Sequence, residues 1–402
     1  MGHKRDHIAA LGGIAACLAL ALLLYHSLAG GTLLAHDVYD SYSLQAENWL
    51  AGRNYIADGE RYTWLELAVY QGRYYHSFPP VPCLLMLPWV LLCGGADAVP
   101  SNLIAALLAL FCAGGCYACC ARARLSPAAA SCLTVFAAFG SNTFWLSTSG
   151  GVWFIAQMLG LCLALWGVFF ALRPTALSCG LASLCMALAV GCRPFYALLL
   201  AYWLLQRLRR PRPFSRLAAA LLPALAVAAC LMGYNAVRFG DPFEFGHNYL
   251  PEFTQAVNGQ FSFHYLLSNL AKLFRPILLD ADLQLHFEIF NGFFLFAANP
   301  LFLLALLRGV HVCLRKEPQR ALPVPMPGWV AGAACVLITL LYCLHRTMGG
   351  WQFGTRYLID LFPWVVLWFC ARPRWVPGPG AWTLCGLAVL FNLYGAVYML
   401  QT

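Results

Sequence analysis

Charged residues are scarce in this sequence. Asp, Glu, Lys and Arg make up 10% of the 402 residues, whereas 61% are hydrophobic. Because about a quarter of a soluble domain is charged, the composition excludes a soluble globular protein and predicts a polytopic membrane protein. The formal charge of +9 does not indicate nucleic-acid binding, because the Lys and Arg residues stand in short clusters between apolar runs, as membrane-flanking residues do.

Cysteine is absent from the two long polar stretches, residues 30–79 and 238–288, although the chain contains 18 cysteines. A disulfide framework needs cysteines in oxidised loops, so we expect none, and the cysteines of the apolar runs are expected to pack as small hydrophobes. No His, Cys, Asp or Glu cluster has the spacing of a metal site. We therefore assign no metal and no resident cofactor. A divalent cation is left open, because Asp37, Asp40 and Asp241 could meet in space.

Apolar runs of membrane-spanning length recur along the whole chain. We predict an all-α, polytopic membrane protein, with residues 1–402 forming a single domain of about eleven transmembrane helices. Residues 81–93 are too short for a span and predict an interfacial or re-entrant helix. The predicted spans are 8–29, 101–121, 127–147, 150–172, 175–192, 194–208, 214–236, 287–307, 328–346, 355–372 and 381–400.

The charge distribution orients these spans. If residues 81–93 do not cross, sixteen of the 25 Lys and Arg residues fall on the side of the N-terminus, which the positive-inside rule makes cytoplasmic. Thirteen of the sixteen Asp and Glu residues fall on the other side, most of them in loops 30–100 and 237–288. We therefore expect the chemistry on the outer face, with juxtamembrane helices in the first outer loop.

Two aspartates stand where the chain leaves the first span. The stretch "DSYSLQAENWL" has apolar residues at helical spacing and predicts a short amphipathic helix on the bilayer surface, with Asp40 at its N-cap and Asp37 just before. In one interpretation Asp40 only caps this helix, as Asn or Ser also would. In the other, a carboxylate held at the membrane surface is the general base for a hydroxyl group.

Cationic residues flank a glycine-rich turn in the third outer segment, "HRTMGGWQFGTRYLIDLFPW". His345, Arg346 and Arg356 either extend their charged ends toward water or bind a phosphate through charge-assisted hydrogen bonds. Arg193, in "GCRPF", is a candidate of the same kind. Asp360 follows Arg356 by one turn and is expected to neutralise it.

The two large outer loops supply further candidates for substrate binding. Tyr75 and His76 precede a Pro-Pro step, and Arg238, Asp241 and Glu244 alternate with aromatics and glycines in "YNAVRFGDPFEFGHNYL". The alternative is structural: an interfacial aromatic belt for the first group and a packed extracellular cap for the second.

Four stretches together resemble a known class. They are "DSYSLQAENWLAGR", "YQGRYYHSFPPVPCLLMLPWVLL", "YNAVRFGDPFEFGHNYL" and "WQFGTRYLIDLFPW". In this order and topology they make the chain similar to the GT-C class of polytopic glycosyltransferases, in particular bacterial family-39-like enzymes related to protein O-mannosyltransferases and aminoarabinose transferases. The chain departs from several members in lacking an adjacent acidic pair, and it ends without the soluble C-terminal domain that some carry.

The resemblance implies an inverting transfer of a sugar from a polyprenyl-phosphate carrier to a hydroxyl acceptor, on the outer face of a bacterial plasma membrane. The first-loop aspartate that serves as base in this class maps onto Asp40 or, because the spacing differs, onto Asp37. Two other functions stay open, a transporter or lipid flippase and a non-catalytic relative. The outer-loop carboxylates favour an enzyme, since Asp360 is the one acidic residue well inside a predicted span.

Overall fold

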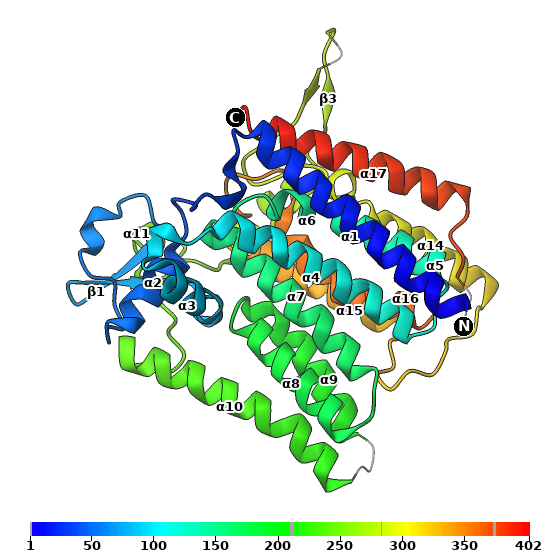
Figure 1. Cartoon of the computed structure of the whole chain (residues 1–402), viewed down its shortest axis with the longest axis horizontal. Helices are drawn as coiled ribbons and strands as arrows, with labels where there is room; N and C mark the ends of the chain where they lie inside the picture. The colour runs from blue at the N-terminus through cyan, green and yellow to red at the C-terminus, as the bar shows by residue number, and fades with distance from the viewer. Residues whose placement is uncertain (1, 210–212, 283, 373–374) are drawn as a thin grey trace.

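A computed structural model describes residues 2–209, 213–282, 284–372 and 375–402. Of the basic clusters that orient the predicted topology, Arg210, Arg212 and Arg374 lie outside the described residues. Most of the described chain is helical, and the long helices form a bundle with a lobe of shorter elements at one end (Figure 1).

Five described helices are long and apolar enough to cross a bilayer. They are α1 (Gly2–Leu28), α4 (Ser101–Arg122), α7 (Val152–Ala171), α10 (Phe214–Phe239) and α17 (Pro379–Tyr398). Shorter apolar helices complete the bundle: α5 (Pro127–Ala138), α8 (Ala176–Val190) and α15 (Gly328–Cys343). The chain is therefore a multi-pass membrane protein, and the count of eleven spans stays a prediction.

Several predicted spans are interrupted in the structure. Span 127–147 divides into α5 and α6 (Asn142–Leu146), span 194–208 into η4 (Pro194–Tyr196) and α9 (Ala197–Leu208), and span 355–372 into η7 (Arg356–Leu361) and α16 (Phe362–Cys370). Span 287–307 is wrong in its first half, because helix α14 (Leu301–Arg315) begins only after the single turn α13 (Leu295–Ala298). Asn291 and Gly292 have positive φ angles, 63° and 87°, which a helix does not accommodate.

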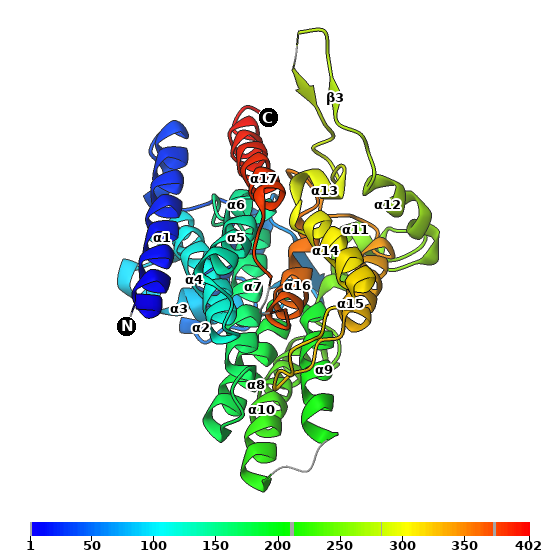
Figure 2. The ribbon, with the colours of Figure 1, turned by 90° about the vertical axis from the view of Figure 1, so that its right-hand side faces the viewer.

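The two chain ends lie at opposite ends of the bundle. Helix α1 runs from the N-terminus toward the lobe, and α17 ends near the point where α1 ends (Figures 1 and 2). This arrangement agrees with the odd number of crossings in the predicted topology. Which end faces the cytoplasm remains a prediction from the charge distribution.

The lobe is built from residues of the two long loops, 30–100 and 237–288, that the sequence predicts to be outer. Helices α2 (Ser41–Leu50) and α3 (Val81–Cys93) pack against each other there, beside the antiparallel hairpin of β1 (Leu67–Tyr70) and β2 (Arg73–His76) (Figure 1). At about 1.5 Å per residue, the 13 residues of α3 are too short for a hydrocarbon core of about 30 Å.

The other short elements of the described chain, inside and outside the lobe, are η1 (Thr32–Leu34), η2 (Gly59–Arg61), η3 (Ala96–Ala98), η5 (His247–Tyr249), α11 (Pro251–Thr254), η6 (Phe263–Tyr265), α12 (Leu266–Lys272), β3 (Leu278–Leu279) and β4 (Leu285–His286).

Helix α2 forms where the sequence predicts it, but it is not the two-faced surface helix that the pattern indicates. Ser43, Gln45 and Asn48 on its polar side are buried together with Tyr42 and Ala46. The reason is that α3, η3 and β2 pack around α2. The helix is thus an internal support of the lobe.

The last helix packs directly behind the glycine-rich turn of residues 349–354. A Cβ atom at Gly395 of α17 would overlap the ring of Phe353, which is fully buried. Asn142 of α6 donates to the carbonyl of Phe353 at 2.6 Å, and Gly354 has a φ of 65° against Ala298. The turn before Arg356 is therefore enclosed by α6, α13 and α17.

Candidate active site

The segment of residues 36–40 is held between the N-terminal ends of α4 and α7. The backbone N–H of Asp37 donates to Ser101 Oγ at 2.9 Å, and the N–H of Val152 donates to the carbonyl of Tyr39 at 3.0 Å. Ser149 Oγ donates to Asp37 Oδ2 at 2.6 Å. These partners come from two other parts of the chain, around residue 101 and residues 149–152, so the position of the aspartates is fixed by tertiary packing.

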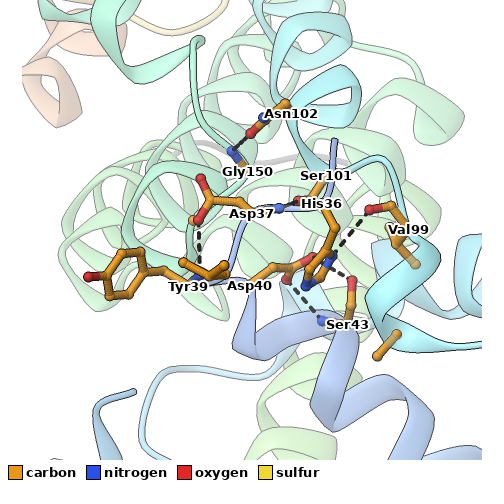
Figure 3. Close-up of polar contacts among 12 residues, drawn as sticks. His36, Asp37, Tyr39, Asp40, Ser43, Val99, Ser101, Asn102 and Gly150 are labelled. Carbon is orange, nitrogen blue, oxygen red and sulfur yellow. Dashed lines mark hydrogen bonds and ion pairs between the residues drawn. The ribbon is translucent and has the colours of Figure 1, made fainter. Parts of the chain in front are cut away.

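Glycine at position 150 is required for this contact. Its N–H donates to Asn102 Oδ1 at 2.7 Å, and a Cβ atom there would overlap the backbone and side chain of Ser101 (Figure 3). The overlap involves backbone atoms, so a side chain could not be accommodated by a rotamer change. Gly150 thereby allows the loop before α7 to approach α4 and carry Ser149 to Asp37.

Asp40 is buried and caps α2, as expected. Its Oδ1 accepts from the N–H of Ser43 at 3.0 Å and its Oδ2 from Ser43 Oγ at 2.5 Å, while His36 Nδ1 lies 3.9 Å from Oδ2. Burial raises the pKa of Asp40 to about 6, partly opposed by the two Ser43 hydrogen bonds and by His36. A carboxyl group with this pKa is suited to act as a base near neutral pH.

The two aspartates face different surroundings. Asp40 turns toward His36 and Ser43, whereas the half-buried Asp37 folds over the backbone of Tyr39, whose N–H donates to Oδ1 at 2.9 Å (Figure 3). A cavity of about 230 Å³ is lined by Asp40 and His36 together with Val38, Leu44, Tyr62, Trp64, Leu65, Ala96 and Asp97. Asp40 therefore borders an open space, and Asp37 borders the start of α7.

Arg356 is buried and joined to α7. It exchanges two hydrogen bonds with Gln157: Gln157 Nε2 donates to its carbonyl at 3.0 Å, and its Nη1 donates to Gln157 Oε1 at 3.2 Å. Its Nη2 donates to the carbonyl of Gly349 at 2.9 Å, and its Nε has no hydrogen-bond partner among the described residues. No carboxylate of the described chain forms an ion pair with it.

Arg193 occupies the same region from a different element. Its Nε donates to Asp360 Oδ2 at 2.7 Å, and its Nη2 donates to Tyr342 OH at 3.1 Å. Tyr196 and Tyr342 also donate their hydroxyl groups to Asp360. The expectation that Asp360 neutralises Arg356 is thus wrong, because residues 356–361 form a 3-10 helix that turns this carboxylate toward Arg193.

One aromatic ring joins the two arginines. The Cζ atom of Arg193 lies 4.7 Å from the centroid of the Tyr357 ring, and that of Arg356 lies 5.0 Å from it. Two guanidinium groups and one ion-paired carboxylate leave this buried cluster with an excess positive charge. Tyr357 was not predicted as a site residue, although it directly follows Arg356 in the sequence.

The N-terminal end of α7 connects the aspartates with the arginines. Ser149 precedes the helix and binds Asp37, Trp153 packs on Tyr39 with a centroid distance of 5.4 Å, and Gln157 binds Arg356. Trp153 and Gln157 are one turn apart, about 6 Å along the helix. The isolated amide of Gln157 inside an apolar run was the one sequence signal of this role.

The other predicted site residues lie in the lobe or at its border. His345 Nδ1 is bonded to the carbonyl of Thr347 at 2.8 Å, and Arg346 donates to the carbonyl of Glu252. Arg238 donates to the carbonyl of His76 at 2.8 Å and packs over Tyr234. Each of these residues is held in place by such structural contacts. Among the described contacts, none of them forms a hydrogen bond with Arg193 or Arg356.

Tyr75 and His76 are buried rather than exposed in an aromatic belt. Tyr75 packs on Phe239 with a centroid distance of 5.2 Å, and His76 packs on Tyr42 at 4.6 Å. Burial, with a smaller contribution from Arg238, lowers the pKa of His76 to about 3, so this imidazole is neutral at pH 7. In the second loop, Asp241 accepts from the N–H of Phe243 and Glu244 from that of Gly246, as turn-forming carboxylates do.

Comparison with solved structures identifies this architecture. The structure of ArnT from Cupriavidus metallidurans bound to undecaprenyl phosphate superposes with a TM-score of 0.52 at 14% sequence identity, over 92% of this chain and 62% of that one. Its apo structure gives a TM-score of 0.51, also at 14% identity, over 93% and 62%. The chain has the GT-C fold. Neither a known protein family nor a curated protein matched the sequence.

The four stretches singled out in the sequence occupy two regions of this fold. The first forms α2 and the second forms β2 and α3, and both belong to the lobe. The third begins in the last turns of α10 and continues into the lobe. The fourth contains Arg356 and enters α16 behind them. The chain spans about three fifths of the length of the ArnT structures that it matches. Within the described residues, no group of three or more His, Cys, Asp or Glu side chains is placed to hold a metal ion.

Proposed function

We propose that this protein is an inverting glycosyltransferase that moves a sugar from a polyprenyl-phosphate carrier to a hydroxyl acceptor on the extracytoplasmic face of a bacterial plasma membrane. The observation that carries the proposal is the pair of guanidinium groups of Arg193 and Arg356 on the ring of Tyr357. A buried cluster with excess positive charge is stabilised by an anion, and a lipid phosphate is an anion that a membrane-embedded site can reach.

The arginines would act on the leaving group. Cleavage of the bond between the sugar and the carrier leaves negative charge on the phosphate, and prepositioned cations stabilise that charge in the transition state. Arg356 has an unpartnered Nε–H for this purpose, and the ion pair with Asp360 fixes the direction of Arg193. Because the lipid phosphate is already a good leaving group, a general acid is not required.

An aspartate would take the proton of the acceptor hydroxyl. Asp40 is the first choice, because it borders a cavity and has a pKa of about 6. Asp37 is the alternative, because Ser149 ties it to the helix that also holds Arg356. General-base assistance of this kind contributes a factor of about 10²–10⁴ in rate.

The proposed partners are a polyprenyl-phosphate-linked sugar, the bilayer and an acceptor of unassigned class. The ArnT structure with undecaprenyl phosphate supports a carrier of this type, since the two chains share their fold. The sugar would lie beneath the lobe, and the lipid tail would lie between spans.

The decisive experiment uses the purified chain in lipid nanodiscs with radiolabelled undecaprenyl-phosphate sugars. Transfer predicts release of free undecaprenyl phosphate that depends on an added acceptor. Loss of this release in Arg356→Gln and Asp40→Asn, with intact folding, supports the proposal. Movement of the lipid across the bilayer without release of phosphate would instead show a flippase, the rival that the buried Arg193–Asp360 pair favours.

A further inference from the structure

A second cavity lies in the lobe, apart from the arginine cluster. Its volume is about 430 Å³, within the range of ligand sites. Its walls come only from the two outer loops, residues 59–74 and 250–252, and include no residue of a long helix. An occupant of this cavity therefore approaches from the water side, whereas a lipid-linked donor approaches from the membrane.

Three carboxylates line this cavity, Glu60, Glu66 and Glu252, and no Lys, Arg or His is among its lining residues. Glu66 Oε2 accepts from Trp153 Nε1 at 3.2 Å, while no described donor reaches Oε1. Burial raises the pKa of Glu66, and the hydrogen bond from Trp153 and the charge of Arg356 partly oppose this shift. Three carboxyl groups and no cationic side chain thus line the cavity, an arrangement that favours a cationic occupant.

The strand that borders the cavity has an open edge. Gln71 and Gly72 both have positive φ angles, 49° and 72°, as in a two-residue type I′ turn, so the flanking pair Tyr70–Arg73 is the hydrogen-bonded one. Hydrogen-bonded and non-bonded pairs alternate in an antiparallel ladder, and Val69 is therefore in a non-bonded pair with Tyr74. The carbonyl of Tyr74 indeed points outward and accepts from the N–H of Ile56 at 2.8 Å.

By the same alternation, the N–H and C=O groups of Val69 point away from β2. No described residue bonds to them, and Val69 is 43% exposed. Leu67 and Val69, two residues apart, both line the cavity. An unpaired strand edge beside a cavity is a site to which an extended chain can add as a further strand.

We propose that this cavity docks an extended peptide segment carrying Lys or Arg, which pairs with β1 as a third strand and directs its cationic side chains to Glu60, Glu66 and Glu252. The interpretation of this cavity as the acceptor site rests on the proposed function. Binding of the peptide, in contrast, is measured without any sugar donor. A saccharide would bind the carboxylates but would not pair with the strand edge. A metal ion would neither pair with the edge nor pack against the apolar walls formed by Leu65, Leu67 and Leu250.

The test is equilibrium binding to the full chain in nanodiscs, followed by fluorescence anisotropy. The probe is a labelled hexapeptide that alternates lysine and threonine. We expect saturable binding that weakens at least tenfold when glutamine replaces the lysines, when alternate amides are N-methylated, or in 0.5 M salt. A glucosamine tetramer and Mg²⁺ are the competing probes.

Protein variants separate the two kinds of contact. Glu60→Gln and Glu252→Gln should each weaken peptide binding several-fold, and Val69→Pro should abolish it by removing the edge N–H, a change that edge strands tolerate. Glu288→Gln, which alters an exposed carboxylate outside the cavity, is the matched control. Size-exclusion profiles verify folding of each variant.

The inference is overturned if the N-methylated and unmodified peptides bind equally, or if the glucosamine tetramer or Mg²⁺ binds and the peptide does not. Peptide binding that persists in Arg356→Gln, a variant without transfer, would show that docking and glycosyl transfer are separate properties. Conversely, transfer without peptide docking would reject this inference and leave the proposed function standing.

Discussion

Arg193 and the buried Asp360 form an ion pair, with Nε and Oδ2 2.7 Å apart, although they stand 167 positions apart in the chain. Asp360 also accepts hydrogen bonds from Tyr196 and Tyr342. The carboxylate is thus fully occupied, and it orients one of the two arginines against Tyr357. The pair is the link between the segment after α8 and the segment before α16.

Breaking this pair should destabilise the protein. Replacing Asp360 with Asn leaves the partly buried guanidinium of Arg193 without its countercharge, which costs at most about 3–5 kcal/mol. Thermal unfolding in detergent should show a clearly lower midpoint for this variant. A double replacement, Arg193→Leu with Asp360→Leu, should recover much of the stability without recovering transfer. Equal midpoints for Asp360→Asn and the wild type would contradict this account.

Replacement of either arginine by lysine should weaken binding of undecaprenyl phosphate at least tenfold. Lysine keeps the charge but loses the planar group that stacks on Tyr357 and binds oxygens in pairs. Tyr357→Phe keeps the ring and should bind nearly as the wild type does, whereas Tyr357→Leu should not. Native mass spectrometry of the lipid complex measures these affinities. Equal affinities for the phenylalanine and leucine variants would rule out the ring as the common support.

Asp40→Asn should lower transfer by a factor of about 10²–10⁴ while leaving lipid binding intact. Asparagine also caps helices well, so α2 is preserved. Asp37→Asn is the paired variant, and the larger loss identifies the base. If Asp40 is the base, transfer in the wild type should rise with pH through about 6, because the base must be deprotonated and burial raises its pKa to that value. A flat profile between pH 5 and 7 would remove Asp40 from this role.

Acidification should destabilise the lobe through its buried histidines. Burial lowers the pKa of His76 to about 3 and that of His247 to about 4. The unfolded chain therefore binds more protons than the folded one below about pH 6.5, and stability falls as the pH drops toward 4. Asp40 opposes this trend, because its raised pKa makes the folded chain take up a proton between about pH 6 and 4. The measurement is the fall in the thermal unfolding midpoint between pH 7.5 and pH 5. This fall should be larger in Asp40→Asn than in the wild type, and smaller in His76→Gln than in the wild type.

Gly150→Ala should disturb the aspartate segment without touching an ionisable group. Its Cβ would overlap Ser101, the residue that accepts from the N–H of Asp37. We expect reduced transfer together with a lower unfolding midpoint. Gly12→Ala, where the added Cβ meets nothing within 4 Å, is the control. A fully active Gly150→Ala variant would show that the contact between this loop and α4 is dispensable.

The sequence predicted the membrane class, the GT-C fold and the cap at Asp40, because these follow from apolar runs, motif order and short-range preferences. It placed Asp360 with Arg356 because residues four apart are neighbours on an α-helix, and the 3-10 geometry of η7 removed that contact. It treated α2 as a surface helix because periodicity cannot reveal that α3 and η3 enclose it. The reciprocal bonds of Gln157 with Arg356, and the Tyr357 ring between the two arginines, involve residues far apart in sequence. The isolated amide of Gln157 in an apolar run was their only local signal.

Helix α17 also supports the turn that carries Arg356, because Gly395 packs against the ring of Phe353. Phe353 stands three residues before Arg356, so the packing of α17 on Phe353 limits the movement of the turn that carries this arginine. A chain truncated before residue 379 would expose that ring to lipid and free the turn to shift. Residues 379–398 thereby help to hold Phe353, and with it the turn that carries Arg356, in place.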